Sequence, residues 1–317
     1  MSPHQDGPAY MRWLPGKTTA TISRFEFMAR GLVDGFISGR HRSPRKGFSV
    51  EFAEHRQYVP GDDIRNIDWR VLARKDRYYV KQYMEETNLR ATILLDCSGS
   101  MAYTGGAAAA FEGRALSKFD YARYLAAALS YLLVGQQDGV GLVTFDSRIR
   151  DFLPAKAMAS QVRHILDRID AAEPGGETAL SDIFNEVAER IPHRGVVIIL
   201  SDFFDDTAEL IKALHHFTFR KHELILLHVM AEEELRFPFN SFAHFKDLES
   251  PIELQLDPKT IRALYLERID AFVKALKDGS GRMQADYVPI NTREPFEKSL
   301  ADYLVRRRMG AGGQPDF

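Results

Sequence analysis

The sequence predicts an α/β protein with a doubly wound, mostly parallel sheet and a small β-rich N-terminal region. Two features of the 317 residues support this prediction. Short, continuously apolar runs recur along the chain, and amphipathic segments separate them. Strands buried on both faces form such runs, and their alternation with helices is typical of a parallel sheet covered on both sides. The composition, 45% hydrophobic and 27% charged, is that of a chain that builds a substantial core.

The N-terminal part is expected to contain a flexible tail at residues 1–20 and a β-rich region at residues 21–89. Within that region, the apolar residues of Ile22–Phe36 predict a short helix. Phe48–Tyr58 and Tyr78–Met84 are rich in β-branched and aromatic residues, which favour strands.

The rest of the chain is expected to form one larger domain at residues 90–308, with an insertion near 231–256 and a disordered tail at 309–317. Apolar runs predict strands at Ala91–Leu95, Gly139–Phe145, Gly195–Leu200, Glu223–Met230 and Ala285–Ile290, and a hairpin partner at Arg148–Leu153. Helical periodicity predicts helices at Ser117–Val134, Ala159–Ile169, Leu180–Ile191 and Ala208–His216.

Two further helices are predicted toward the C-terminus. Asp257 followed by Pro258 is a typical helix start, with a capping carboxylate before a proline in the first turn. The Gly-Ser-Gly sequence at 279–281 predicts that this helix ends near Lys277. Thr292 is expected to cap a final helix that reaches about Arg308.

The composition argues against several classes of protein. The 42 Lys and Arg against 44 Asp and Glu give a net charge of −2, which disfavours attachment to nucleic acid by bulk charge. The single cysteine, Cys97, excludes an intramolecular disulfide and favours a reducing compartment, so we expect a cytoplasmic protein. The longest apolar run, Tyr124–Gly135, is too short for a bilayer, and the N-terminus lacks the apolar core of a signal peptide. No membrane span is therefore expected.

Acidic and hydroxyl side chains follow two of the predicted strands. Asp96, Ser98 and Ser100 form a D-x-S-x-S pattern after the first strand of the larger domain, and Asp202 follows the strand that ends at Leu200. A glycine-rich loop before a helix adds Thr178. Because ligand sites of parallel sheets lie beyond the carboxyl ends of the strands, we expect these side chains to meet.

These five side chains offer two carboxylates and three hydroxyls, which is an all-oxygen set. Such hard ligands suit Mg²⁺ or Mn²⁺ and not Zn²⁺. Waters would complete the octahedron, and one position could remain open for an oxygen atom of a partner. The alternative is purely structural, because Asp and Ser are also common at strand ends and caps.

A second charged segment follows the turn at Pro60–Gly61. The simplest interpretation is structural: an ion-pair network attaches the β-rich region to the larger domain, and Trp69 is a packing anchor. The alternatives are a partner-docking surface, or a second metal or nuclease-like site formed by the three aspartates. The candidate residues are Asp62, Asp63, Arg65, Asp68, Trp69 and Arg74.

These motifs resemble known families. DCSGSM at 96–101, GGET at 175–178 and ILSD at 199–202 resemble the metal-ion-dependent adhesion site of von Willebrand factor A domains. The predicted element order from residue 90 to residue 308 is similar to that fold. Upstream, residues 47–86 resemble the signature of a bacterial family catalogued as domain of unknown function 58, and the two resemblances together cover roughly residues 25–308.

The resemblance implies roles for the site residues. Ser98, Ser100 and Thr178 would contact the metal, while Asp96 and Asp202 would act mainly through water. A protein partner would supply an Asp or Glu to the open position. Family members are often encoded beside MoxR-class AAA+ ATPases. The resemblance therefore implies a non-enzymatic, metal-dependent adaptor or co-chaperone in protein assembly or remodelling.

Two other functions stay open. One is a Mg²⁺-dependent phosphohydrolase, because phosphatases of the haloacid dehalogenase type also place an Asp after the first strand. Those enzymes typically have a second Asp two residues later, where this chain has Ser98, and the chain lacks a P-loop pattern. The other is a structural protein whose metal site is vestigial and empty.

Overall fold

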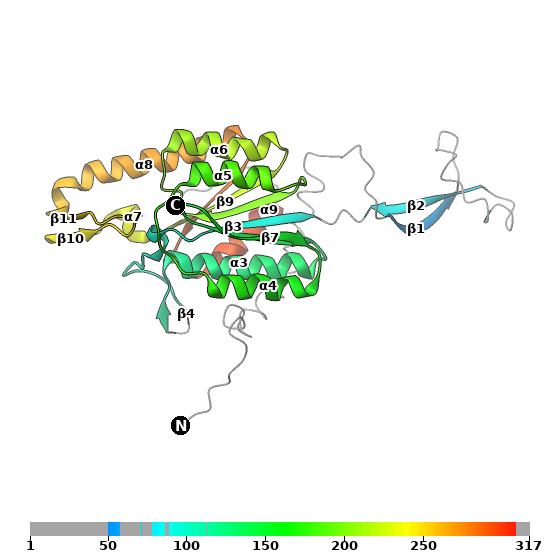
Figure 1. The fold of residues 1–317 in the computed structure, drawn as a ribbon, viewed down its shortest axis with the longest axis horizontal. Coiled ribbons are helices and arrows are strands. Elements are labelled where there is room, and N and C mark those ends of the chain that lie inside the picture. Colours follow the sequence, from blue (N-terminus) through cyan, green and yellow to red (C-terminus); the bar gives the residue numbers. More distant parts are fainter. Residues whose placement is uncertain (1–49, 58–70, 72–77, 86–88, 112, 309–317) are drawn as a thin grey trace, which may run out of the picture. The chain divides into compact units, whose positions relative to one another are not determined.

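The computed structural model describes residues 50–57, 71, 78–85, 89–111 and 113–308 (Figure 1). The chain divides into two compact units, of which the smaller comprises Phe36–Asn88 and the larger contains Leu89–Phe317. In the smaller unit, β1 (Val50–Gln57) pairs antiparallel with β2 (Tyr79–Glu85). Both strands predicted in this region are confirmed, whereas the predicted helix between residues 22 and 36 lies outside the described residues.

The larger unit is built on a six-stranded sheet with the order β12-β9-β8-β3-β6-β7. All neighbouring strands run parallel except β6 and β7, which form an antiparallel hairpin at one edge. This is the mostly parallel α/β sheet that the sequence predicts. The strands are β3 (Arg90–Asp96), β6 (Gly139–Phe145), β7 (Ile149–Lys156), β8 (Val196–Ser201), β9 (Glu223–Met230) and β12 (Asp286–Asn291).

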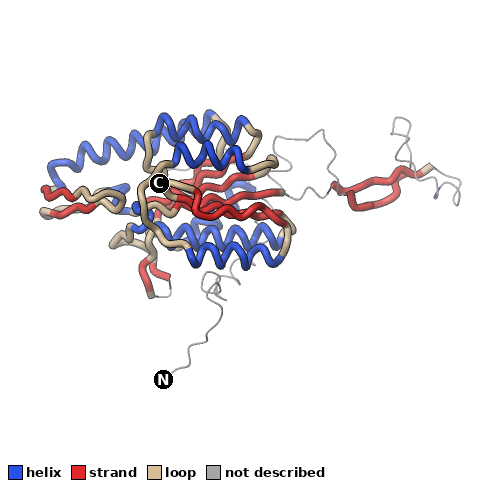
Figure 2. The backbone as a smooth tube through the Cα atoms, in the orientation of Figure 1, coloured by secondary structure: helices blue, strands red, loops and turns tan. Residues whose placement is uncertain are grey.

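Helices cover both faces of this sheet (Figures 1 and 2). On one face lie α5 (Leu180–Arg190), α6 (Thr207–Phe219) and α8 (Pro258–Arg282), which share one apolar core with the sheet. On the other lie α3 (Lys118–Gly135), α4 (Ala159–Ala171) and α9 (Phe296–Arg308). Burial on both faces explains why the central strands are continuously apolar, since each large aliphatic side chain removed from water contributes about 1.5–3 kcal/mol.

Helix α8 is longer than the sequence predicts. Asp257 caps it as expected, because its carboxylate accepts a hydrogen bond from the Lys259 backbone N–H. The predicted end near Lys277 is wrong, because the helix continues through the Gly-Ser-Gly sequence to Arg282. A Cβ atom on Gly279 would lie 2.7 Å from a side-chain carbon of Ile211, so this glycine serves close packing of α8 on α6.

The prediction that Thr292 caps the last helix is also wrong. Helix α9 begins at Phe296, and Thr292 lies buried at the end of β12. Its N–H donates to the Met230 carbonyl and its carbonyl accepts from the Ala109 N–H. Thr292 therefore ties the end of the sheet to the loop after β3, and these backbone bonds hold it outside the helix.

The predicted insertion contains a short helix and a hairpin. Helix α7 (Glu232–Arg236) follows β9, and β10 (Ala243–Lys246) pairs antiparallel with β11 (Glu253–Leu256). Aromatic contacts anchor the base of this hairpin: Phe237 lies 5.7 Å from Phe245 and 4.4 Å from Tyr265 of α8 between ring centroids. The hairpin tip at residues 247–252 extends beyond this anchor.

The order in which strands are added to the sheet reverses at β3. From this central strand the chain adds β6 and β7 on one side and then returns to add β8, β9 and β12 on the other. The carboxyl ends of β3 and β8 therefore flank the switch point, where open α/β sheets bind their ligands. The sequence analysis singled out Asp96, which ends β3, and Asp202, which directly follows β8.

Candidate metal centre

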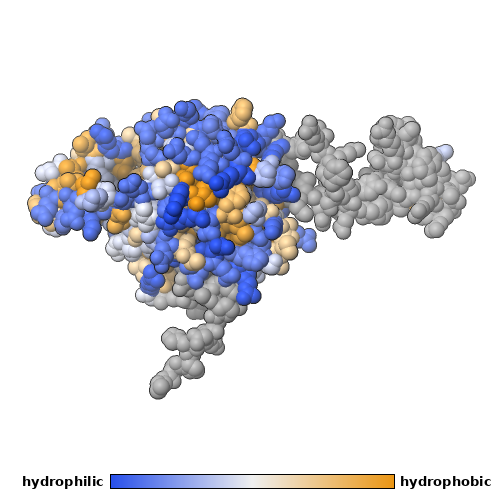
Figure 3. Space-filling view, in the orientation of Figure 1, coloured by the Kyte–Doolittle hydropathy of each residue, from blue (hydrophilic) through white to orange (hydrophobic). Residues whose placement is uncertain are grey.

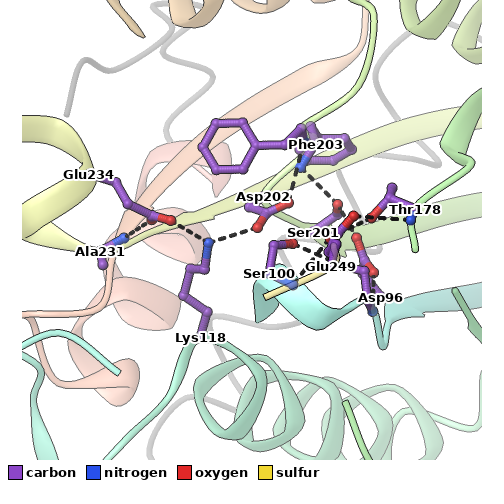
Figure 4. Close-up of polar contacts among 12 residues, drawn as sticks. Asp96, Ser100, Lys118, Thr178, Ser201, Asp202, Phe203, Ala231, Glu234 and Glu249 are labelled. Carbon is purple, nitrogen blue, oxygen red and sulfur yellow. Dashed lines mark hydrogen bonds and ion pairs between the residues drawn. The ribbon is translucent and has the colours of Figure 1, made fainter. Parts of the chain in front are cut away.

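The site begins with two side chains that end neighbouring strands. Leu95 of β3 lies opposite Leu200 of β8, so Asp96 and Ser201 follow side by side. The Ser201 hydroxyl donates to Asp96 Oδ2 over 2.5 Å, and both residues are buried (Figure 4). Ser201 therefore orients the first carboxylate of the site.

The loop after β3 folds back onto the same carboxylate. Asp96 Oδ1 accepts a hydrogen bond from the Ser98 N–H over 2.8 Å, and the chain then forms a 3-10 turn, η3 (Gly99–Ala102). This turn brings the hydroxyl oxygens of Ser98 and Ser100 to within 3.1 Å of each other. The D-x-S-x-S spacing thus places one carboxylate and two hydroxyls together.

A glycine-rich loop brings the third hydroxyl to the site. Gly175 N–H donates to the Cys97 carbonyl over 2.9 Å, and Gly99 N–H donates to the Gly176 carbonyl over 3.0 Å. Gly176 has a φ of +90°, a conformation that L side chains rarely adopt, so a glycine suits this position. Through these bonds the two loops run together and Thr178 reaches the site.

The second carboxylate, Asp202, follows Ser201. Its Oδ1 accepts a hydrogen bond from the Phe204 N–H, and its Oδ2 lies 2.7 Å from the Lys118 ammonium. Phe203 between them has a φ of +55°, in the left-handed region that glycine favours. Burial of the Phe203 ring against His228, 5.6 Å away between centroids, offsets the cost of this conformation.

Lys118 at the start of α3 is fully buried between two carboxylates (Figure 4). It lies 2.5 Å from Glu234 of α7 as well as 2.7 Å from Asp202. Burial lowers the pKa of the ammonium, but the two carboxylates outweigh burial and raise it. The group is therefore a fixed positive charge, and burial raises the pKa of Glu234 despite that charge.

Negative charge exceeds positive charge at this edge of the sheet. Burial, and secondarily the charge of Asp202, raises the pKa of Asp96 to about 7, although hydrogen bonds from Ser201 and Ser98 oppose the rise. A buried carboxylate with such a pKa lacks a compensating cation. The Lys118 charge is shared between Asp202 and Glu234 and leaves Asp96 uncompensated.

A third carboxylate arrives from the hairpin tip. Glu249 Oε1 accepts from the Thr178 hydroxyl over 2.7 Å and from the Ser100 N–H over 3.1 Å, and Oε2 accepts from the Thr178 N–H over 3.1 Å (Figure 4). The glutamate therefore lies where two of the predicted metal-contacting residues converge. The sequence analysis missed Glu249, because it lies in the segment that was expected to be an insertion, 71 residues from Thr178.

The donor set is compatible with a hard divalent cation. Neighbouring oxygens in an octahedron with metal–oxygen bonds of about 2.0–2.1 Å lie about 2.9 Å apart. The Ser98–Ser100 hydroxyl pair is 3.1 Å apart and the Thr178–Glu249 oxygen pair 2.7 Å. Within the described ranges no group of three or more His, Cys, Asp or Glu side chains is placed to hold a metal ion, so an ion here would depend on hydroxyl and water oxygens.

The five predicted metal-site residues lie at the end of β3 or in the segments that follow β3 and β8 and precede α5: Asp96, Ser98, Ser100, Thr178 and Asp202. The sequence analysis did not identify four further residues around this centre: Lys118, Ser201, Glu234 and Glu249. Ser201 precedes Asp202 at the strand end and was recognisable there. The charged candidates of the upstream segment lie outside the described residues: Asp62, Asp63, Arg65, Asp68, Trp69 and Arg74.

Comparisons with known proteins place the chain in a family. The model of the family described as protein of unknown function DUF58 matches residues 54–272, and the chain belongs to this family. The uncharacterized protein Rv1480 of Mycobacterium tuberculosis is 26% identical over 305 residues, which cover 93% of this chain and 91% of that protein. The uncharacterized protein Mb1516 of Mycobacterium bovis matches to the same extent.

Two solved structures match the chain at low sequence identity. The conserved hypothetical protein BatB from Bacteroides thetaiotaomicron is 16% identical, with a TM-score of 0.41, over 70% of this chain and 100% of that chain. An aerotolerance-related membrane protein from Bacteroides fragilis is 16% identical, with a TM-score of 0.42, over 70% of this chain and 99% of that one.

Among the helices that the structure describes, none combines the length and apolar character needed to cross a bilayer.

Proposed function

We propose that the larger unit is a von Willebrand factor A-like module that binds a divalent cation, Mg²⁺ or Mn²⁺, and uses it to bind an acidic side chain of a protein partner. One observation carries this proposal. Two carboxylates and three hydroxyls lie together at the carboxyl ends of β3 and β8, where the strand order reverses (Figure 4). This is the location at which α/β sheets bind ligands, and the donors are those that Mg²⁺ prefers.

In this proposal each residue has a defined task. The hydroxyls of Ser98, Ser100 and Thr178 would hold the ion, and Asp96 and Asp202 would hold its waters. The bound ion would act as a Lewis acid that receives a carboxylate oxygen of the partner. Asp96 supports this assignment, because its raised pKa marks a buried negative charge that a cation would stabilise.

The biological setting is also a proposal. The family resemblance suggests an adaptor or co-chaperone that works with a MoxR-class AAA+ ATPase in protein assembly or remodelling. A cytoplasmic location is proposed on the single, buried Cys97, whose thiol pKa is raised to about 12 by burial and by Asp96. Such a thiol is poorly reactive, as expected for a structural cysteine in a reducing compartment.

A second candidate is a structural protein with a vestigial metal site, and Lys118 favours it. Its ammonium already neutralises part of the charge of Asp202, at 2.7 Å, and would repel an incoming cation. In that case the hydroxyls and Asp96 would only stabilise the loops. The two candidates differ in one measurable property, the response of folding stability to divalent metal.

Thermal and urea unfolding in Mg²⁺, Mn²⁺ or EDTA tests the proposal. Metal at about 100 times its dissociation constant should stabilise the wild type by about 2.7 kcal/mol, and Ser98→Ala should abolish this gain. A purified MoxR-class ATPase should then be retained on the immobilised chain in Mg²⁺ and released by EDTA. Identical stability of the wild type in Mg²⁺ and EDTA would refute metal binding and favour the vestigial site.

A further inference from the structure

The hairpin β10–β11 carries its tip to the proposed metal centre. Asp247 shapes this tip, because its carboxylate accepts hydrogen bonds from the Glu249 N–H, over 3.0 Å, and from the Ser250 hydroxyl. The Asp247 N–H in turn donates to the Ile252 carbonyl over 3.0 Å and closes the turn. The tip therefore has its own internal structure, which directs the Glu249 side chain.

Neutral donors hold the Glu249 carboxylate. Its partners are the N–H groups of Ser100 and Thr178 and the hydroxyl of Thr178. No ion pair to Glu249 occurs in the part of the chain that the structure describes. Lys118 pairs with Asp202 and Glu234 but not with Asp96 or Glu249, so these two carboxylates lack a basic partner that a bound cation would supply.

The loop after β3 leaves room for the tip. A Cβ atom on Gly99 would lie only 2.4 Å from the Leu248 carbonyl oxygen and 3.1 Å from Glu249 Cγ. No larger residue fits here without displacing the tip, because the conflicting atom belongs to the backbone. The glycine of the D-x-S-G-S motif thus has a specific role, to permit the approach of residues 248 and 249.

The hairpin exposes several large apolar side chains. Phe242, Leu248, Ile252 and Leu254 are 46–69% exposed, and Figure 3 shows orange side chains where Figure 1 places β10 and β11. The tip therefore buries little apolar surface, while aromatic contacts hold the base of the hairpin through Phe237. Such a tip can lift without unfolding the hairpin, because mainly polar contacts hold it at the site.

We propose that Glu249 is an internal ligand of the metal centre, which occupies the position that an acidic partner would take. This inference rests on the proposed function. The hairpin would close the site in the free protein, and an external carboxylate would bind only in exchange for Glu249. The chain would thereby regulate its own partner binding, because the free energy of releasing the tip would be subtracted from the free energy of partner binding.

Metal titration of full-length variants tests this assignment. Removal of an outer-shell partner already lowers metal affinity by about 10–100-fold, so Glu249→Ala, which removes a direct ligand, should weaken Mn²⁺ binding by at least about tenfold. Glu253→Gln is the matched control, because Glu253 lies on the same hairpin and contacts His244 and Lys246 instead of the site. Calorimetric titration gives the affinities, and circular dichroism confirms that the variants are folded.

Acetate serves as the probe for the vacated position. It should restore Mn²⁺ affinity to Glu249→Ala but leave the wild type unchanged, and the relaxation of water protons by bound Mn²⁺ should be faster in the variant because a water replaces the glutamate. If the wild type binds Mn²⁺ and Glu249→Ala binds it equally well, the internal ligand is refuted and the metal site stands. If the wild type binds no metal, both proposals fall.

Discussion

Lys118 Nζ lies 2.7 Å from Asp202 Oδ2 in the interior of the larger unit, and both side chains are almost completely buried. A buried ammonium beside a proposed metal-site carboxylate sets the electrostatics of the whole site. It supplies one fixed positive charge, which Asp202 and Glu234 share, and it leaves Asp96 and Glu249 without a basic partner. The behaviour of this pair on substitution therefore depends on whether a second cation is present.

Lys118→Met should destabilise the protein by about 3–5 kcal/mol in EDTA, because it leaves two buried carboxylates without their partner. In saturating Mg²⁺ the loss should be smaller, because the metal compensates Asp202. Urea unfolding in the two buffers measures the difference. Lys212→Met is the control: this lysine is exposed on α6 beside Glu209, and its loss should cost at most about 1 kcal/mol. Equal losses for Lys118→Met in both buffers would contradict a cation at the site.

Asp96→Asn should have opposite effects in the two buffers. Burial raises the pKa of Asp96 to about 7, so its ionised form destabilises the metal-free fold at pH 8. In EDTA at that pH, the neutral amide should make the protein more stable by about 1–3 kcal/mol. In Mg²⁺ the wild type should gain stability and the variant should not. Thermal unfolding at pH 8 with and without metal measures both effects, and an equal gain from Mg²⁺ in both proteins would count against the assigned role.

Gly99→Ala should release the hairpin tip. The added methyl group would lie 2.4 Å from the Leu248 carbonyl oxygen. The shifts that such overpacking forces typically destabilise a protein by about 1–3 kcal/mol. Hydrogen exchange should become faster at residues 247–252 and remain unchanged in the central strands. Gly106→Ala is the control, because its methyl group would lie 3.6 Å from Glu233, an ordinary contact. Unchanged exchange at the tip in Gly99→Ala would show that the close approach of Leu248 is not needed.

Asp138 should make stability depend on pH. Burial raises the pKa of this carboxyl to about 7, and the hydrogen bond from the Leu89 N–H only partly opposes the rise. The folded chain therefore keeps a proton that the unfolded chain releases above about pH 4. The stability that depends on this proton is fully present at low pH. As the pH rises from about 4 to 7, the free energy of unfolding falls by up to about 1.4 kcal/mol per pH unit.

Asp138→Asn removes this titration. The difference in unfolding free energy between variant and wild type should grow in favour of the variant as the pH rises from 4 to 7, and should stay constant above that range. Urea unfolding of both proteins across these pH values gives the difference directly, so other titrating groups cancel. Parallel pH profiles would show that the pKa of the Asp138 carboxyl is the same in the folded and the unfolded protein.

The order of strands and helices was predictable because it depends on local pattern. Continuous burial makes Gly139–Phe145 and Glu223–Met230 apolar throughout, and their observed bounds match the predicted ones. The errors fall where a tertiary contact overrides a local signal. Gly279 packs against Ile211 within α8 instead of ending it, and Thr292 bonds to the sheet instead of capping α9.

The residues of the proposed metal centre also divide into those that local sequence predicts and those that only tertiary packing brings together. Asp96, Ser98 and Ser100 come together through bonds between residues two apart, so their spacing in the chain already defines the motif. Lys118 lies 84 residues from Asp202, and Glu249 lies 71 residues from Thr178. These pairs meet because helix α3 packs beside the sheet and the hairpin folds over its edge. No local pattern encodes such a meeting, since long-range contacts depend on the packing of whole elements, and here they supply the charges that surround the site.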